Sequence, residues 1–515
     1  MSTAPKKTGL SVDPTVFFTS AALMVAFVGA GALFTDTMGE AASALQSAIV
    51  SHFGWLYILV VGAFPAFAIY LMCSRFGNVR LGPDDARPEY GTFAWLSMLY
   101  GAGLGIGLVF YGVAEPILHY ATPPRGPALT PDAAEQSLMF TMYHWGLHPW
   151  ALYIVMGLAL AYGSFRRGLP FTISSTLYPL IGEGIHGPIG KAVNILAVFG
   201  TLFGLATSLG LGVSQIASGL NAVAGIESTT GLQIGLIALI TAIATLSVVA
   251  GLDKGIRRLS LANAGLALGL LAFVVVTGPT LVILNALPQN LGTYLQELVG
   301  VTFFSEAYNG GDWQASWTLF YWGWWVSWTP FAGMFIARIS RGRTIREFIA
   351  GTMVVPTLVT LVWFTGFGNA SLYLQQSGAA DMVGAVQQSA STSLFVLLEQ
   401  LPLSMLSSVL ALIVITLFFV TSSDSASFVI DMITSGGDEN PPVAQRVFWA
   451  VSEGVVAAIL LIVGGLGALQ TASLTTGLPF TIVLVVIAIA LIRTLQLNEA
   501  TPLHKGQQLS TTAAE

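Results

Sequence analysis

Long apolar segments alternate with short polar ones along the whole chain. Stretches of about 20 predominantly apolar residues, the length with which a helix crosses a bilayer, recur twelve times. We expect transmembrane helices at 14–35, 54–74, 92–112, 136–163, 189–215, 232–251, 259–286, 314–337, 347–374, 402–428, 443–466 and 475–494. The pattern therefore predicts an all-α polytopic membrane protein with twelve transmembrane helices, whose two chain ends lie on the same side of the membrane.

The Lys and Arg residues indicate the orientation of these helices. With the N-terminus inside, 18 of the 19 basic residues fall in inner loops or tails, and only Arg125 falls outside. Cytoplasmic loops of membrane proteins carry an excess of Lys and Arg. We therefore expect both termini in the cytoplasm, as tails at 1–13 and 495–515.

The composition agrees with this fold class. Of the 515 residues, 54% are hydrophobic and only 9% are charged, as is typical of membrane proteins. The single Cys73 cannot form an intramolecular disulfide, and we expect no removable signal peptide. Basic residues are confined to loops and the last residues contain no basic run. Membrane lipids are therefore expected around the protein, with no lipid-sensing tail and no nucleic-acid partner.

The segment 317–331 concentrates five tryptophans in one expected span. On a helix, Trp324, Trp325 and Trp328 fall within an arc of about 100°, with Tyr321 and Phe331 in or beside it. An interfacial aromatic belt is one explanation, but the cluster lies near the middle of its span. Because aromatic faces attract quaternary ammonium groups, we favour a cation cage over plain packing.

Glycines occupy alternate positions in the third span, at Gly101, Gly103, Gly105 and Gly107. Their spacing of four also suits close helix packing, so that explanation stays open. The other explanation is a locally unwound helix that lines a cavity, where amide groups suit a carboxylate and carbonyl groups suit Na⁺.

The glycine-rich third span and the Gly- and Pro-interrupted eighth span lie five spans apart. This spacing fits two five-helix repeats of inverted topology, formed by spans 3–7 and 8–12. The chain then divides into two peripheral helices, a first repeat, an outer loop with a short amphipathic helix at its surface, and a second repeat, at 14–91, 92–286, 287–313 and 314–494.

Hydroxyl side chains crowd the tenth span, where Thr421, Ser422 and Ser425 share an arc of about 100°. Such hydroxyls often only bond a carbonyl of the preceding turn. They could instead ligate Na⁺, because hard cations prefer oxygen ligands. The neighbouring Asp424 adds an acid in or near the membrane, which is a functional hypothesis in itself.

The fourth span carries a second group of candidate residues. Trp145, Trp150 and Tyr153 cover about 140° of a helix and could form another part of a cage. His144 and His148 have the i, i+4 spacing of metal ligands, although hydrogen bonds between helices explain them better.

Two glutamates lie at membrane depth: Glu115 ends the glycine-rich third span, and Glu453 lies well inside the eleventh. Each is expensive at that depth unless it is paired or protonated. Either could carry a coupling proton, and we favour a satisfied structural role for both.

Together these motifs resemble the betaine/carnitine/choline transporter family. The resemblance rests on Trp-Gly-Trp-Trp-Val-Ser-Trp-Thr-Pro-Phe with Ile-Ala-Arg-Ile-Ser-Arg-Gly-Arg, on Gly-Leu-Gly-Ile-Gly-Leu-Val-Phe-Tyr-Gly, and on Thr-Ser-Ser-Asp-Ser. It implies a LeuT-like inverted-repeat core of spans 3–12, alternating access, a homotrimer and a bacterial inner membrane.

The resemblance also implies roles for individual residues. The central cage would be Trp324, Trp325 and Trp328, next to a box of Trp145, Trp150, Tyr153 and Trp325, with Phe331 beside the pathway. The glycine pattern itself, and not the resemblance, predicts that the amides at Gly103, Gly105 and Gly107 bind the substrate carboxylate. One Na⁺ would bind Gly101, Leu104, Thr421 and Ser422, and a second would bind Thr201, with Ser208 in place of the hydroxyl that is missing at Leu205. Choline-selective members tend to carry Asp where this chain has Gly107, which favours a zwitterionic substrate.

The sequence therefore predicts a secondary transporter that imports glycine betaine or a similar onium zwitterion with Na⁺, and not an enzyme; apart from Na⁺ no cofactor is expected. One alternative is a Na⁺-independent exchanger or H⁺ symporter for carnitine, choline or dimethylsulfoniopropionate. A membrane metalloenzyme built on His144, His148 and Glu115 is the alternative of another class. A substrate sensor without flux is disfavoured by the short tails.

Overall fold

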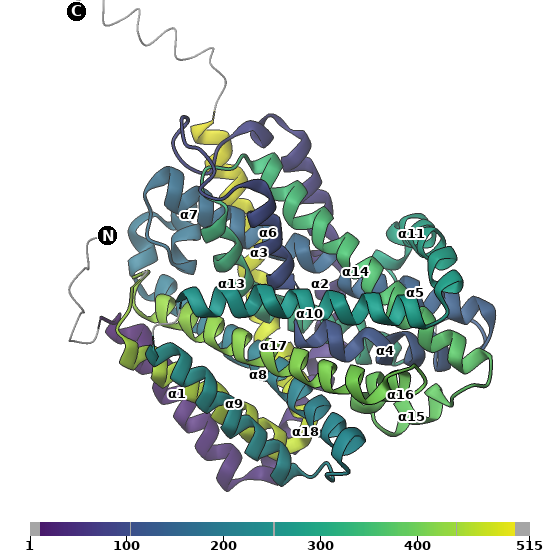
Figure 1. The fold of residues 1–515 in the computed structure, drawn as a ribbon. Helices are drawn as coiled ribbons and strands as arrows, with labels where there is room; N and C mark the ends of the chain where they lie inside the picture. Colours follow the sequence, from purple (N-terminus) through teal and green to yellow (C-terminus); the bar gives the residue numbers. More distant parts are fainter. Residues whose placement is uncertain (1–10, 104, 251–252, 309, 439, 500–515) are drawn as a thin grey trace, which may run out of the picture.

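The protein is a bundle of α-helices (Figure 1) in a computed structural model that describes residues 11–103, 105–250, 253–308, 310–438 and 440–499. Within these ranges the only strand-type pairing is an isolated bridge between Arg80 and Thr344. The first half contains α1 (Pro14–Leu33), α2 (Thr35–Cys73), α3 (Thr92–Gly103), α4 (Ile106–Ala121), α5 (Pro131–Trp145), α6 (Leu147–Ala161), α7 (Tyr178–Ile181), α8 (Pro188–Ala224), α9 (Thr230–Ala250) and α10 (Asp253–Thr277). The second half contains α11 (Thr280–Thr302), α12 (Trp313–Ser316), α13 (Thr318–Ile339), α14 (Ile345–Gln376), α15 (Met382–Gln388), α16 (Ser393–Glu399), α17 (Ser404–Thr434) and α18 (Val443–Asn498). Short 3₁₀ or π turns join them at Arg75–Asn78, Tyr162–Arg166, Ile173–Leu177, Gly182–His186 and Ala390–Thr392.

Nine helical segments in the described part of the chain are long and apolar enough to cross a membrane. The tryptophan-rich α13 is 22 residues long but is not one of the nine. Its Trp, Tyr, Gly and Pro residues lower its mean hydropathy. The expected all-α polytopic membrane protein is thus confirmed, while the number of twelve crossings stays a prediction.

The core is built around α13, which packs against α6, α8 and α18. Small residues allow the close approach. A Cβ atom on Gly323 would lie 2.7 Å from Leu474 Cα, and one on Gly200 would lie 3.3 Å from the carbonyl oxygen of Ser327. Close backbone contact at small residues is how helices associate in membranes. It places the tryptophan-rich segment at the centre of the molecule.

The third expected span is divided into α3 and α4, as the unwound-helix interpretation predicts. Helix α3 ends at Gly103 and α4 begins at Ile106, and Gly105 between them is extended, with φ −124° and ψ 177°. A Cβ atom on Gly105 would meet no other atom within 4 Å. Gly101 lies in the last turn of α3, and Leu104 lies outside the described residues.

The expected interruption of the eighth span is wrong, because α13 runs unbroken through Pro330. A second break instead divides the fourth span at Gly146, between α5 and α6. A Cβ atom there would lie 2.5 Å from the carbonyl oxygen of Met142 and 2.6 Å from Tyr294 Oη. Position 146 therefore requires glycine, because the Tyr294 side chain of α11 and the carbonyl oxygen of the preceding turn leave no room for a side chain.

Three other boundaries differ from expectation. Helix α2 begins at Thr35, well before residue 54, and α11 begins at Thr280, inside the expected seventh span. Helix α18 covers both of the last two expected spans, with a sharp bend at Gly464 and Gly465. The amphipathic helix expected on the outer surface is part of α11, but its Tyr294 is only 1% exposed. This helix therefore reaches into the core.

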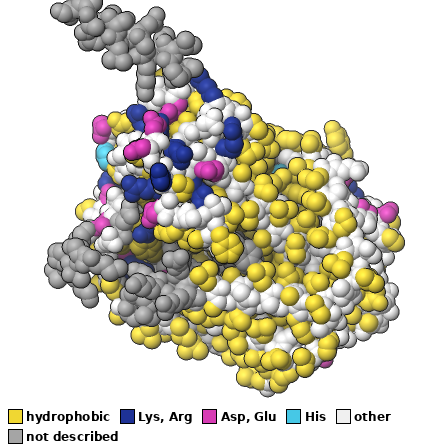
Figure 2. Space-filling view, turned by 45° about the horizontal axis from the view of Figure 1, so that its top comes forward, with side chains coloured by type: hydrophobic (Ala, Val, Ile, Leu, Met, Phe, Trp, Pro, Cys, Tyr) yellow, Lys and Arg dark blue, Asp and Glu magenta, His cyan; other side chains and the backbone are white. Residues whose placement is uncertain are grey.

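Charged side chains gather at one end of the molecule, and most of the rest of the face in view is apolar (Figure 2). A hub of hydrogen bonds and ion pairs joins several segments expected inside the cell. Arg166 contacts both carboxylate oxygens of Glu499, at 2.6 and 3.0 Å, and Asp84 at 2.8 Å. Arg125, the basic residue expected outside, does not take part in these contacts and instead lies 3.9 Å from Glu297.

Candidate functional site

The candidate site is an aromatic cluster where α4, α5 and α13 meet. The indole rings of Trp324 and Trp325 stack with centroids 4.8 Å apart and an interplanar angle of 11°. Phe320 stacks on Trp324 at 5.5 Å, and Tyr321 stacks on Trp325 at 5.8 Å. The edge of Trp145 meets Trp325 at 4.8 Å. The ring faces thus cover one another, and the cluster is closed in this conformation.

Gly107 joins the glycine-rich helix to this cluster. A Cβ atom at Gly107 would lie 2.6 Å from Trp324 Cη2 and 2.8 Å from Trp145 Cη2. One turn later, Tyr111 contacts the rings of Trp145, Tyr321 and Trp324 at 6.1, 5.5 and 6.3 Å. Tyr111 is a site residue that was not predicted, although its position four residues after Gly107 on a helix is a signal in the sequence.

Hydrogen bonds fix the three indoles. Trp324 Nε1 donates to the carbonyl oxygen of Gly204 at 3.1 Å, and Trp325 Nε1 donates to that of His144 at 2.9 Å. Trp145 Nε1 donates to Glu115 Oε2 at 2.8 Å. Because each buried N–H group has an acceptor, the rings are oriented by their polar edges as well as by packing.

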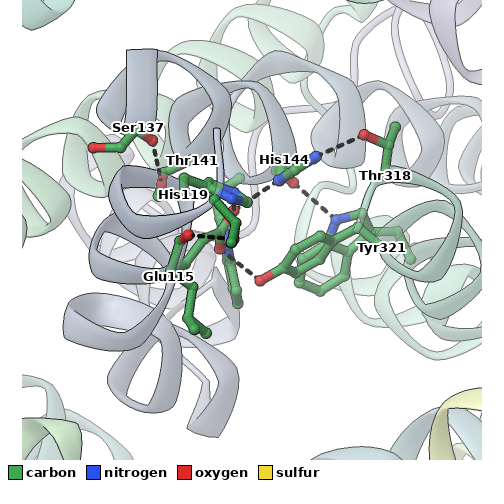
Figure 3. Close-up of polar contacts among 11 residues, drawn as sticks. Glu115, His119, Ser137, Thr141, His144, Thr318 and Tyr321 are labelled. Carbon is green, nitrogen blue, oxygen red and sulfur yellow. Dashed lines mark hydrogen bonds and ion pairs between the residues drawn. The ribbon is translucent and has the colours of Figure 1, made fainter. Parts of the chain in front are cut away.

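Glu115 is the hub of a buried polar network behind the cluster (Figure 3). Its Oε2 accepts from Trp145 Nε1 and from Tyr321 Oη at 2.6 Å. Its Oε1 lies 2.7 Å from His144 Nδ1 and 3.1 Å from His119 Nε2. Four donors from three helices can satisfy an ionised carboxylate. The interpretation of Glu115 as a satisfied buried group is thereby confirmed.

The two histidines of the fourth span do not form a metal pair. His144 Nε2 lies 2.9 Å from Thr318 Oγ1, and His148 Nε2 lies 3.0 Å from Thr302 Oγ1. The break at Gly146 separates them, so the i, i+4 spacing does not bring them to one point. Both make hydrogen bonds between helices, as the second interpretation predicts.

Glu115, His119 and His144 place one possible ligand atom each within 4.8 Å of one another. Their surroundings do not suit a metal ion. The second carboxylate oxygen is already occupied by the indole N–H of Trp145 and the hydroxyl of Tyr321. An indole N–H can only donate and would face the cation with its positive end. Hydrogen bonding therefore accounts for this group better than metal binding does.

The remaining aromatic candidates form two separate pairs. Trp150 and Tyr153 meet at 5.6 Å, and Trp328 and Phe331 meet at 5.1 Å. Among the described residues, no ring contact joins either pair to Trp145 or Trp324. Gly204 lies between Trp324 and Trp328, since a Cβ atom there would be 2.7 Å from Trp328 Cδ1. The expected box of four rings is not closed in this conformation.

The hydroxyl groups of the tenth span lie on α17. Thr421 Oγ1 donates to the carbonyl oxygen of Leu417 at 2.8 Å, which is the local bond that such hydroxyls often make. Thr421, Ser422 and Ser425 are partly exposed, whereas Ser423 and Asp424 are buried. Helix α17 also contacts α4. The first ion site stays a prediction, and its ligand Leu104 lies outside the described residues.

The second expected ion site is not supported by the geometry of α8. Thr201 and Ser208 lie seven residues apart on this unbroken helix, which separates them by about 10 Å along its axis. Ser208 Oγ donates to the carbonyl oxygen of Gly204 at 3.3 Å, and Thr201 Oγ1 is buried without a partner in the described residues. The two hydroxyls do not meet at one point in this conformation, and the second ion site stays a prediction.

Comparison with known proteins gives a consistent assignment. The sequence model of the BCCT, betaine/carnitine/choline family transporters matches residues 15–500. A transporter of Mycobacterium tuberculosis is 49% identical over 502 residues, covering 96% of this chain and 84% of the relative. The glycine betaine transporter OpuD of Bacillus subtilis is 44% identical, with 96% of each chain covered. The high-affinity choline transport protein of Escherichia coli K12 is 42% identical, covering 95% of this chain and 73% of the relative.

The family and these relatives are transporters, so the metalloenzyme alternative is wrong. The aromatic cluster, the broken glycine-rich helix and the match along nearly the whole sequence agree with one another. The chain belongs to the betaine/carnitine/choline family of membrane transporters.

Proposed function

We propose that the protein imports glycine betaine, or a similar onium zwitterion, by Na⁺ symport through an alternating-access cycle in a bacterial inner membrane. One observation carries this proposal. The rings of Trp324 and Trp145 lie against Gly107, directly beside the break between α3 and α4, and Trp325 packs on both rings. The site thus combines aromatic faces for a cation with helix-end amides for an anion.

The onium end of the substrate would bind among the indoles. In the closed cluster the faces of Trp324 and Trp325 are covered, so binding requires the rings to separate. Trp145 belongs to α5 and Trp325 belongs to α13, so a movement between these helices opens a space between their rings. Coupling of cage opening to helix movement is what an alternating-access transporter needs.

The carboxylate end would bind at the start of α4. The first amide groups of a helix lack acceptors within the helix and favour anions, and Gly105 leaves open space beside them. An Asp side chain at position 107 would collide with Trp324 and Trp145, because even a Cβ atom would lie within 2.8 Å of both rings. The glycine therefore favours a substrate that brings its own carboxylate over choline, which has none.

Na⁺ would bind between the break in the third span and α17, with the Thr421 and Ser422 hydroxyls and the Gly101 and Leu104 carbonyls as ligands. The hydroxyls lie on a partly exposed face of α17, and α17 contacts α4. An ion held between these two elements would favour one conformation of the cycle by its differential affinity.

We also propose twelve spans with cytoplasmic termini, an inverted-repeat core of spans 3–12 and assembly as a homotrimer. The contacts of Arg166 support the orientation, because it joins three segments expected inside. The opposite expected side contains Arg125 with Glu297. The trimer rests on family membership alone, and cross-linking of the purified protein would test it.

The decisive experiment is uptake of labelled glycine betaine into proteoliposomes with an inward Na⁺ gradient, compared with K⁺ replacing Na⁺. Accumulation that requires Na⁺ supports the substrate class and the coupling ion. Equal uptake in K⁺ would reject Na⁺ symport in favour of exchange or H⁺ symport. If glycine betaine is not taken up, binding assays with carnitine, choline and dimethylsulfoniopropionate would identify the onium compound.

The ion site has its own test in a double variant, Thr421→Ala with Ser422→Ala. We expect its uptake to become independent of Na⁺ or to be lost, because two of the four proposed ligands are gone. Thr416→Ala is the matched control, since Thr416 lies on the same helix and makes the same kind of bond, to the carbonyl oxygen of Leu412 at 2.8 Å. Normal Na⁺ stimulation in the double variant would reject these ligands.

A further inference from the structure

The membrane region contains two fully buried glutamates that differ in the number of hydrogen-bond donors around them. Glu115 and Glu453 are both 0% exposed. Glu115 lies among four donors that can satisfy a negative charge. Glu453 has one hydrogen-bond partner among the described residues, since its Oε2 accepts from Ser423 Oγ at 3.0 Å. Its Oε1 is buried without any hydrogen-bond partner in the part of the chain that the structure describes.

No described cation pairs with Glu453. Arg446 lies two turns earlier on α18, about 10 Å away along the axis. Its guanidinium lies 3.7 Å from Asp424 and over the ring of Phe428, where Arg338 of α13 also lies. The guanidinium groups of Arg446 and Arg338, where α17 and α18 meet, thus contact Asp424 and Phe428 and not Glu453.

The other helices near Glu453 bring few titratable side chains. Helix α9 contacts the next residue, since a Cβ atom on Gly454 would lie 2.3 Å from Thr241 Oγ1. The sequences of α9 and α1 contain no titratable residue, and α8 has only Lys191, which pairs with Asp13. Helix α17 brings Asp424 and Asp431, which would add negative charge. Nothing in this environment favours a charged Glu453.

The depth of Glu453 makes an unpaired charge costly. It lies ten residues after the start of α18 at Val443, about 15 Å along the helix. That is about half of the 30 Å hydrocarbon thickness of a bilayer. A carboxylate at this depth requires a partner cation, several donors or a proton. A metal ion such as Na⁺ would need several oxygen ligands, but among the described side chains only the Ser423 hydroxyl is hydrogen-bonded to Glu453.

We propose that Glu453 binds a proton and is a neutral carboxylic acid at neutral pH, which makes it the proton-binding site of the interface between α17 and α18. Its neutral form keeps the Ser423 contact without a buried charge. At alkaline pH the proton is lost, and the new charge must draw in water or push α17 away from α18. Transport should therefore fall as the pH rises, and not as it falls.

The consequence for transport rests on the proposed function, because Ser423 directly follows the proposed ion ligands Thr421 and Ser422. The protonation state of Glu453 does not rest on it. Two measurements separate the protonation state of Glu453 from its effect on transport. One detects the protonated carboxyl group directly, and the other measures uptake.

The first measurement is the infrared absorption of protonated carboxyl groups in the purified protein, in H₂O and in D₂O. We expect a carbonyl band at neutral pH that is absent from Glu453→Gln and disappears from the wild type at alkaline pH. Glu115→Gln is the control and should keep this band. Because Asp431 is a second buried acid whose Oδ2 lacks a described partner, all the proteins compared carry Asp431→Asn. A band that then survives in Glu453→Gln, or no such band at all, would overturn the proposal.

The second measurement is the pH profile of glycine betaine uptake by the wild type and by Glu453→Gln. Wild-type uptake should decline at alkaline pH by up to about tenfold per pH unit, the limit for loss of one proton. Glu453→Gln should keep its uptake there, because a carboxamide stays neutral. Matching profiles in the two proteins would overturn the link to transport. If neither protein transports glycine betaine, the substrate is wrong and the infrared result still decides the proton site.

Discussion

The sequence predicts which rings of the aromatic cluster share one face of a helix, but it does not predict whether these rings enclose a cavity or pack on one another. The arc that contains Trp324 and Trp325 was predictable from helical spacing. The same spacing puts Trp322 on the opposite side of the helix, where its ring contacts Tyr143 and His148 at 5.0 and 5.6 Å. Whether the rings enclose a cavity or cover one another depends on their side-chain rotamers. Spacing does not specify these.

Trp325→Leu tests the cage. Removing this indole should weaken glycine betaine binding by about 1–2 kcal/mol, a rise in Kd of about 5- to 30-fold, because one cation–π partner is lost in a desolvated site. Trp322→Leu removes an indole of the same helix that faces away from the cluster, and its Kd should stay close to that of the wild type. Binding titrations of the purified proteins would measure both. Equal Kd values for the two variants would reject the cage.

Glu115 should stabilise the closed cluster through its oxygen atoms more than through its charge. In Glu115→Ala, Trp145 Nε1 and Tyr321 Oη lose their acceptor in a buried site, at a cost of about 1–3 kcal/mol for each group. In Glu115→Gln the amide oxygen can still accept from both, and the two imidazoles can adopt their other tautomers. We expect a clearly lower melting temperature in detergent for the Ala variant than for the Gln variant. The same loss in both would show that the charge is what matters.

At the scale of elements, the helix breaks explain which parts of the fold were predictable. Four glycines in seven residues weaken a helix enough to indicate the break near Gly105. The break at Gly146 depends on a single glycine and on Tyr294 of α11, whose hydroxyl lies 3.1 Å from the amide nitrogen of Leu147. Such a long-range contact leaves no local signal. Pro330 suggested a break that does not occur, because packing in a membrane bundle tolerates a proline within a helix.

The bend in α18 should depend on Gly465. This residue has φ 59° and ψ −140°, a backbone conformation that is open almost only to glycine. Gly465→Ala should destabilise the protein by about 1–3 kcal/mol. Gly467→Ala is the matched control, because a Cβ atom there would meet nothing within 4 Å. A thermal melt of both variants that shows no difference would mean that the bend can move to another residue.

For the whole molecule, the charge pattern was more informative than the helix boundaries. Segments expected inside the cell lie far apart in the sequence but meet in the structure, as Arg166 meets Glu499 and Arg343 donates to the carbonyl oxygen of Tyr90 at 2.9 Å. The length of α2 could not be predicted, because a hydropathy pattern marks the part of a helix in lipid and not its extension beyond. Helix α18 is long because two expected spans join through the bend at Gly464 and Gly465. Orientation is therefore the property to test next.

Two reporter cysteines can test that orientation directly. The chain has one cysteine, so Cys73→Ser provides a cysteine-free background. In that background we place one reporter at Asp85 and another at Tyr308, which are both exposed and lie on opposite expected sides. A membrane-impermeant maleimide added to intact cells should label Tyr308→Cys but not Asp85→Cys, and added to inverted vesicles it should do the reverse. Because two expected spans precede Asp85 and seven precede Tyr308, labelling of both from one side would mean that an even number of crossings separates them. The twelve-span arrangement, and with it the pairing of the third span with the eighth, would then have to be abandoned.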